Sequence, residues 1–156
     1  MNEEKIIAAI KENLKDKVLE ITNPSPRRIF FKVDKNNLCE AISMLKEKLG
    51  FTHLATITGL DKTDSFELLY HFADDTNVIN IRVAISRENP IVSTVTGVIP
   101  GAILYEREIQ DMFGIKVENI PDPRPLITPD DWPEGAYPLR KDWKYERPGE
   151  TIPGGK

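Results

Sequence analysis

The chain has 156 residues, a length that favours one domain, and a hydrophobic content of 40%, which favours a folded protein over a disordered one. Its net charge of −4 and its lack of a basic run argue against nucleic acid as a partner. No apolar stretch reaches the ~18 residues of a membrane span, and the acidic N-terminus is unlike a signal peptide. We therefore expect a cytosolic chain that contacts a membrane only through a partner.

Cysteine and histidine are scarce, and this limits the metal chemistry of the chain. Cys39 is the single cysteine, whereas an iron–sulfur cluster is normally held by four thiolates. His53 and His71 are the only histidines, so a zinc site with four Cys or His ligands cannot be assembled. The sequence predicts no cofactor in this chain, and it predicts that the histidines are hydrogen-bonded strand residues.

The first predicted elements are a helix and two strands. Apolar residues recur at helical spacing over residues 3–18. The following segment, VLEITNPSPRRIFFKVD, has a turn at residues 23–26 between two short strands. Apolar and polar residues alternate in the second of these strands, which is typical of a half-buried strand.

A second helix and three more strands follow. Asp34 is a suitable helix cap, apolar residues recur from Leu38 to Leu49, and Gly50 is a suitable helix end. Residues 51–59, 66–74 and 77–86 are rich in β-branched and aromatic residues and predict three strands. Asn89-Pro90 ends the last of them, and residues 91–99 are expected to form a short helix.

This order of elements predicts an α+β fold of two layers: helix, two strands, helix, three strands. Helices are expected to cover one face of a mixed, mostly antiparallel sheet. A short charged helix and a proline-rich, extended C-terminal arm complete the chain. We expect residues 1–118 to form the α+β domain, with the charged helix included, and residues 119–156 to form the arm.

The composition of the arm predicts a stiff segment that packs against something. Eight of the 12 prolines lie between Pro121 and Pro153, and three of them occupy alternate positions. This excludes a helix and favours extended backbone. Large side chains that could hold the arm in place are Leu126, Ile127, Trp132, Tyr137, Leu139, Trp143 and Tyr145. The surface beneath them is either the chain's own domain or a partner protein.

The stretch YEREIQDMFGI, residues 105–115, predicts a short charged helix. Arg107 and Asp111 are four residues apart and share a face. Apolar residues are expected on the opposite side: Leu104, Ile109, Met112 and Phe113. Gly114 suits a left-handed end to the helix.

Three interpretations of this helix stay open from the residues alone. Its charges can form a solvated face with one exposed ion pair. Glu106 and Glu108 can be the acid and base of a free-standing enzyme, which requires a pocket beside them. The helix can also be a surface that binds another protein, either in a subunit of a complex or in an independent binding module.

Two motifs stand in a fixed order along the chain. The first combines Glu106, Arg107 and Glu108 with Asp111, Met112, Phe113 and Gly114. The second is Pro138, Leu139, Arg140, Lys141 and Asp142, preceded by Arg124, which stands before Pro-Leu-Ile. Together they resemble the family of the thirty-kilodalton, C-type subunit of respiratory complex I (NADH-quinone oxidoreductase), which also occurs in energy-converting membrane-bound nickel–iron hydrogenases. Ile120 and Tyr137 depart from the resemblance, because family members commonly carry histidine there.

The resemblance implies a cofactor-free accessory subunit, without activity of its own, in the hydrophilic arm of a membrane oxidoreductase. Its implied partners are the large subunit, which forms the quinone site or carries nickel–iron, and the iron–sulfur subunits. Its implied location is peripheral, on the cytoplasmic side of the cell membrane through the complex. The motif residues are the expected partner interface, and the charged ones are expected to form charge-assisted contacts within the arm or across that interface: Glu106, Arg107, Glu108, Asp111, Arg124, Arg140, Lys141 and Asp142. They do not select the electron donor or acceptor, because those sites lie on other chains.

Overall fold

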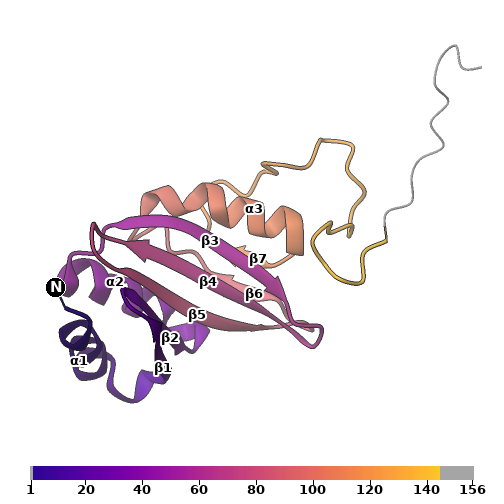
Figure 1. Cartoon of the computed structure of the whole chain (residues 1–156). Helices are drawn as coiled ribbons and strands as arrows, with labels where there is room; N and C mark the ends of the chain where they lie inside the picture. The colour runs from indigo at the N-terminus through magenta and orange to yellow at the C-terminus, as the bar shows by residue number, and fades with distance from the viewer. Residues whose placement is uncertain (1, 145–156) are drawn as a thin grey trace, which may run out of the picture.

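The computed structural model describes residues 2–144 and has an α+β fold (Figure 1). The helices in this range are α1 (Glu3–Leu14), α2 (Leu38–Leu49) and α3 (Ile103–Phe113), with short 3₁₀ turns at Lys15–Lys17, Lys35–Asn37 and Pro100–Ala102. The strands are β1 (Val18–Ser25), β2 (Arg28–Val33), β3 (His53–Asp61), β4 (Ser65–Ala73), β5 (Val78–Ser86), β6 (Ile91–Ser93) and β7 (Lys116–Glu118). The predicted fold class is confirmed.

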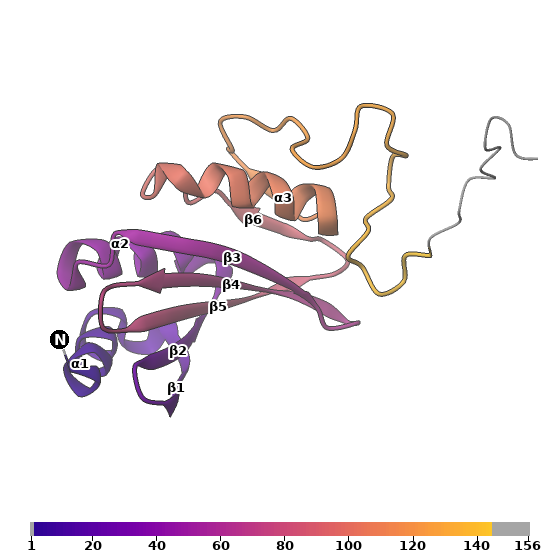
Figure 2. The same cartoon turned by 45° about the horizontal axis from the view of Figure 1, so that its top comes forward.

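Five strands form one mixed sheet in the order β1-β2-β5-β4-β3. β2 and β5 are parallel, and the other neighbouring pairs are antiparallel. β6 and β7 form a separate parallel pair. β1 and β3 are therefore the two edges of the main sheet, and β3 lies next to α3 in Figures 1 and 2.

One face of the sheet carries the core. The inward side chains of β4 and β5 are almost fully buried, as their alternating pattern predicts: Phe66, Leu68, Tyr70, Phe72, Ile79, Ile81, Val83 and Ile85. They form a single cluster with apolar residues of α1, α2 and α3. The opposite face is polar, and there His71 lies within hydrogen-bonding distance of Thr58 and Asn80.

Two predictions of local structure are wrong. The first helix ends at Leu14 instead of residue 18, because Lys15 adopts a positive φ of 49° and Val18 already pairs with Val33 of β2. Residues 91–99 are not a helix: Ile91–Ser93 pair with β7, and turns follow. Val92 is buried in the core, so tertiary pairing determined the structure of this short stretch.

The described part of the arm, residues 119–144, contains neither helix nor strand. After β7 it passes over the side of α3 that faces away from the sheet (Figures 1 and 2). Tyr145 lies outside the described residues. The division of the chain into a domain and an arm stays a prediction.

Candidate functional site

Glu106 connects α3 to the loop that follows β6. Its side chain is buried, and the residue is only 2% exposed. One carboxylate oxygen accepts a hydrogen bond from the N–H of Val95 at 2.7 Å, and the other accepts one from the hydroxyl of Thr94 at 2.6 Å. Burial raises the pKa of Glu106, and these two bonds partly offset that effect. Glu106 is therefore a buried structural contact and not part of a solvated face.

Arg107 binds the backbone of the arm with a planar, multidentate guanidinium. It donates from Nε to the carbonyl of Arg124 at 2.7 Å and from a terminal nitrogen to that of Pro125 at 2.9 Å. A second terminal nitrogen lies 3.2 Å from the carboxylate of Asp122, which also pairs with the side chain of Arg124 at 2.7 Å. This geometry requires arginine rather than lysine, because one side chain makes several directed bonds.

Asp111 binds the next part of the arm. One of its carboxylate oxygens accepts hydrogen bonds from three consecutive N–H groups, those of Leu126, Ile127 and Thr128, at 2.8, 2.7 and 3.3 Å. Arg107 and Asp111 thus share a face, as their spacing predicts, and both side chains direct their hydrogen bonds to the arm. The arm leaves Leu126 and Ile127 exposed.

The C-terminal end of α3 is covered by the second motif. Gly114 ends the helix with a φ of 65°, and the ring of Tyr137 packs so closely that an added Cβ would clash with it. The free carbonyls at the helix end accept hydrogen bonds from this segment. The N–H of Leu139 donates to Met112 at 3.1 Å, and Nε of Arg140 donates to Phe113 at 2.6 Å.

A buried carboxylate at the end of β3 holds the last described part of the arm. Asp61 accepts hydrogen bonds from Arg87 at 2.7 Å, from the N–H of Lys141 at 2.9 Å and from the N–H of Thr63 at 2.8 Å. Arg87 also pairs with Asp142 at 2.9 Å. Burial alone would raise the pKa of Asp61, but the bonds from Lys141, Arg87 and Thr63 outweigh it and lower this pKa to about 2.

Aromatic rings support the same junction. Phe66 meets Phe113 edge-on, with 6.1 Å between ring centroids. The guanidinium of Arg87 lies 4.9 Å from the centroid of Phe66, and that of Arg140 lies 5.1 Å from it. Arg140 also stacks on Tyr137 at 4.3 Å. These cation–π contacts join the second motif to the core of the sheet domain.

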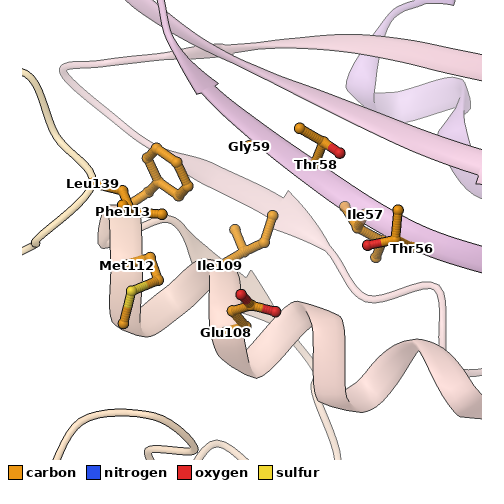
Figure 3. Close-up of a pocket in the computed structure, with 9 residues that line it drawn as sticks. All are labelled: Thr56, Ile57, Thr58, Gly59, Glu108, Ile109, Met112, Phe113 and Leu139. Carbon is orange, nitrogen blue, oxygen red and sulfur yellow. The ribbon is translucent and has the colours of Figure 1, made fainter.

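Glu108 occupies a different place from Glu106. It is exposed and lines a groove of about 250 Å³ between α3 and β3, with Ile109, Met112, Phe113, Leu139 and residues 56–59 (Figure 3). Glu106 faces Thr94 and Val95 instead. The acid and base interpretation requires both carboxylates beside one pocket. The structure instead places Glu106 and Glu108 in different surroundings.

The two predicted motifs meet around the end of α3. Along the chain they are 24 residues apart, from Gly114 to Pro138. Their role toward a partner stays a prediction. Sequence reasoning missed Asp61, Arg87 and Asp122, because isolated charges at strand ends and turns look like ordinary loop residues. The expectation for Leu104 is wrong: it is 52% exposed on α3 and does not join the apolar side.

Residues 2–144 contain no group of three or more His, Cys, Asp or Glu side chains placed to hold a metal ion. Within the same range, every helix is too short or too polar to cross a bilayer. The site consists of contacts between protein segments: a charged helix, a groove beside it and an arm bound across it.

The fold and the site define a small α+β protein whose charged helix binds its own C-terminal segment. The sequence profile described as "Respiratory-chain NADH dehydrogenase, 30 Kd subunit" matches residues 31–149 of this chain. The chain belongs to this family, and the resemblance drawn from the two motifs is confirmed.

Curated relatives come from several kinds of complex. The C subunit of F(420)H(2) dehydrogenase from Methanosarcina mazei is 34% identical over 148 residues, which are 92% of this chain and 93% of that protein. The C subunit of NADH-quinone oxidoreductase from Chloroherpeton thalassium is 35% identical over 88% of this chain, which spans 59% of that relative. Formate hydrogenlyase subunit 5 of Escherichia coli is 32% identical over 97% of this chain and 29% of its own length.

A solved structure has the same fold. A chain of the membrane-bound sulfane sulfur reductase, described as an archaeal respiratory membrane complex, superposes with a TM-score of 0.80 and 28% sequence identity. The match covers 90% of this chain and 85% of that one. The fold is therefore shared with a chain that belongs to a multi-subunit membrane complex.

Proposed function

We propose that this chain is an accessory subunit of a complex-I-like membrane oxidoreductase, in which it positions other subunits and carries no electrons itself. It docks on the large subunit that forms the quinone site or, in a hydrogenase, holds nickel–iron. The electron carriers, iron–sulfur clusters among them, belong to the partner subunits. The chain lies on the cytoplasmic side of the membrane and is attached through the complex.

The relative that carries this proposal is formate hydrogenlyase subunit 5. This chain matches 29% of it, so that protein holds the same region within a much longer polypeptide. A covalent link keeps two regions at high effective concentration and is favoured where they work as one unit. We infer that the part of formate hydrogenlyase subunit 5 outside the match corresponds to the large partner of this chain.

Within this proposal, residues 1–118 are the folded domain and residues 119–156 are the arm that extends the interface. Arg107, Asp111 and Arg140 hold the described part of the arm against α3. The exposed Leu126, which Asp111 holds in place, is available to a partner as an apolar contact. Desolvated charge pairs at such a surface fix register and partner choice more than they add affinity.

The proposal is tested by affinity purification of the tagged chain from its native membrane, followed by mass spectrometry. We expect recovery of a large subunit related to the unmatched part of formate hydrogenlyase subunit 5, together with iron–sulfur subunits. Recovery of the chain alone, or of partners unrelated to redox chemistry, would contradict the proposal. So would turnover of a substrate by the purified chain without partners, which the acid and base interpretation requires.

Arg140→Ala adds a residue-level test of assembly. This change removes the bond to the carbonyl of Phe113 and the stacking on Tyr137. Arg28→Ala is the matched control, because Arg28 is exposed on β2 and its side chain makes no hydrogen bond or ion pair within residues 2–144. We expect Arg140→Ala to reduce the recovered large subunit and Arg28→Ala to leave it unchanged. Equal recovery with both variants would remove Arg140 from the assembly surface.

A further inference from the structure

The two edges of the main sheet are protected to different degrees. β1 carries Pro24 and two register irregularities, which are common devices against unwanted strand pairing. β3 has one irregularity near its start and then continues as Thr-Ile-Thr-Gly-Leu, residues 56–60, without proline or charge. The β3 edge is therefore the one that can accept a further strand.

The register shows which backbone groups lie on this open edge. Lys62 donates its N–H to the carbonyl of Ser65, so these two residues form a hydrogen-bonded pair. Thr58 lies opposite Leu69 in the same register, four residues earlier along the chain, and therefore also belongs to a hydrogen-bonded pair. Hydrogen-bonded and non-bonded pairs alternate in an antiparallel ladder, so Ile57 and Gly59 direct their N–H and C=O groups away from β4. These groups have no hydrogen-bond partner within the part of the chain that the structure describes.

Both ends of the β3 edge are already covered. The carbonyl of Ala55 accepts a hydrogen bond from the hydroxyl of Tyr105 at 2.8 Å. At the other end, Asp61 binds the N–H of Lys141 from the arm. Between them, Ile57 and Gly59 border the groove beside α3, so the open window spans only a few residues (Figure 3).

The far side of the groove supplies an apolar surface and one negative charge. Met112 and Leu139 line it, and Leu139 is 54% exposed. Glu108 is exposed there and makes no hydrogen bond or ion pair within residues 2–144, whereas Glu106, Arg107 and Asp111 on the same helix are all engaged. An occupant of complementary charge therefore carries a lysine or arginine opposite Glu108.

We propose that the groove between α3 and β3 binds an extended segment of the large partner subunit as an added strand. The backbone of this segment pairs with Ile57 and Gly59, an apolar side chain rests on Met112 and Leu139, and a basic side chain meets Glu108. Strand addition of this kind draws affinity from the main chain and specificity from the side chains. The identity of the partner rests on the proposed function, and the location of the groove does not.

Amide hydrogen exchange on the purified complex and on the isolated chain tests this proposal. The N–H groups of Ile57 and Gly59 are expected to exchange about tenfold or more slowly in the complex, because each gains a hydrogen bond. An intact complex in which both amides exchange as fast as in the isolated chain would overturn the docking and leave the proposed function standing. Absence of any co-purifying redox subunit would overturn both.

Two pairs of variants sharpen the result. Thr56→Lys places a charge beside the open edge, and Thr22→Lys is its control on the exposed β1 edge. Glu108→Lys reverses the charge that faces the groove, and Glu12→Lys makes the same change on the exposed side of α1. Thr56→Lys and Glu108→Lys are expected to lower recovery of the large subunit about tenfold, a difference of about 1.4 kcal/mol in binding, and the controls to leave it unchanged.

Two results would contradict this inference. Recovery as high with Glu108→Lys as with Glu12→Lys would remove the basic side chain from the proposed occupant. Slower exchange of Ile57 and Gly59 that appears in the isolated chain as its concentration rises would assign the groove to a second copy of this chain instead.

Discussion

The sheet domain and the arm are held in place by different kinds of interaction. In the sheet domain, apolar side chains from all three helices and from strands of both sheets form one continuous core. The arm has no such core in residues 119–144, and Leu126, Ile127 and Leu139 stay exposed. It is bound by a few polar side chains of the domain, mainly Arg107, Asp111 and Asp61.

From this difference we predict that the arm can be released without unfolding the sheet. Burial of apolar surface is distributed over many residues, and its loss lowers the stability of the whole domain. A hydrogen bond from one side chain acts locally, and its net contribution is about 1 kcal/mol. Substitutions in the core of the sheet should therefore change the free energy of unfolding. Substitutions at the contacts of the arm should change the position of the arm, with little effect on that free energy.

The largest effect is expected from Ile81→Ala in the centre of β5. Ile81 is fully buried, so the change leaves a cavity and should lower the free energy of unfolding by about 2–5 kcal/mol. Urea denaturation measures this loss. Leu19→Ala is the control, because Leu19 is 61% exposed on β1 and should change stability by less than about 0.5 kcal/mol. Similar losses from both variants would contradict a core centred on β5.

Gly114→Ala should affect both regions at once. Gly50 and Gly114 both end helices with positive φ, 76° and 65°, but only Gly114 has a side chain packed against it, the ring of Tyr137. Gly50→Ala is expected to cost about 1 kcal/mol through backbone strain alone. Gly114→Ala should cost more and also speed amide exchange at Leu139. If both variants lose the same stability and the amide of Leu139 exchanges at an unchanged rate, the packing of Tyr137 contributes nothing to stability.

Asp111→Ala should loosen the arm with little effect on the sheet. The N–H groups of Leu126, Ile127 and Thr128 lose their shared acceptor, and their exchange should speed up about tenfold. The urea midpoint should shift only slightly, because the lost bonds are at the surface. Glu108→Ala, one turn earlier on the same helix, is the control and should leave these three amides unchanged. Unchanged exchange in Asp111→Ala would mean that other contacts hold this part of the arm.

Acid is expected to act on one contact between the arm and β3. Asp61 has its pKa lowered to about 2, against about 4 for a free aspartate, so its bonds stabilise the fold fully above pH 4. This contribution is lost as the pH falls from about 4 to about 2, because protonation then weakens the bonds from Lys141 and Arg87. The amide resonance of Lys141 should titrate with a midpoint near 2, and in Asp61→Asn it should not titrate there. A midpoint near 4 would contradict the bonded geometry.

The sequence predicted the sheet domain better than the contacts of the arm, and particular residues show why. β4 and β5 were predictable because their alternating apolar residues occupy one face, and a shift by one residue would expose all of them. The short stretch Ile91–Ser93 was not predictable, because so few residues fit a helix or a strand equally well. Glu106 looked like one of several surface charges, and only its burial against Val95 sets it apart.

The α+β class, the lack of four cysteine ligands for a cluster and, through the two motifs, the family could all be predicted from the sequence. These features depend on local periodicity, on composition and on the order of residues, all of which can be read along the chain. The contacts of Arg107 and Asp111 with the arm, and the bond from Lys141 to Asp61, 80 residues away, became visible only in the folded chain. The same holds for the backbone groups of β3 that have no hydrogen-bond partner among residues 2–144. Such contacts depend on where the folded sheet places distant segments, and no local pattern encodes that distance.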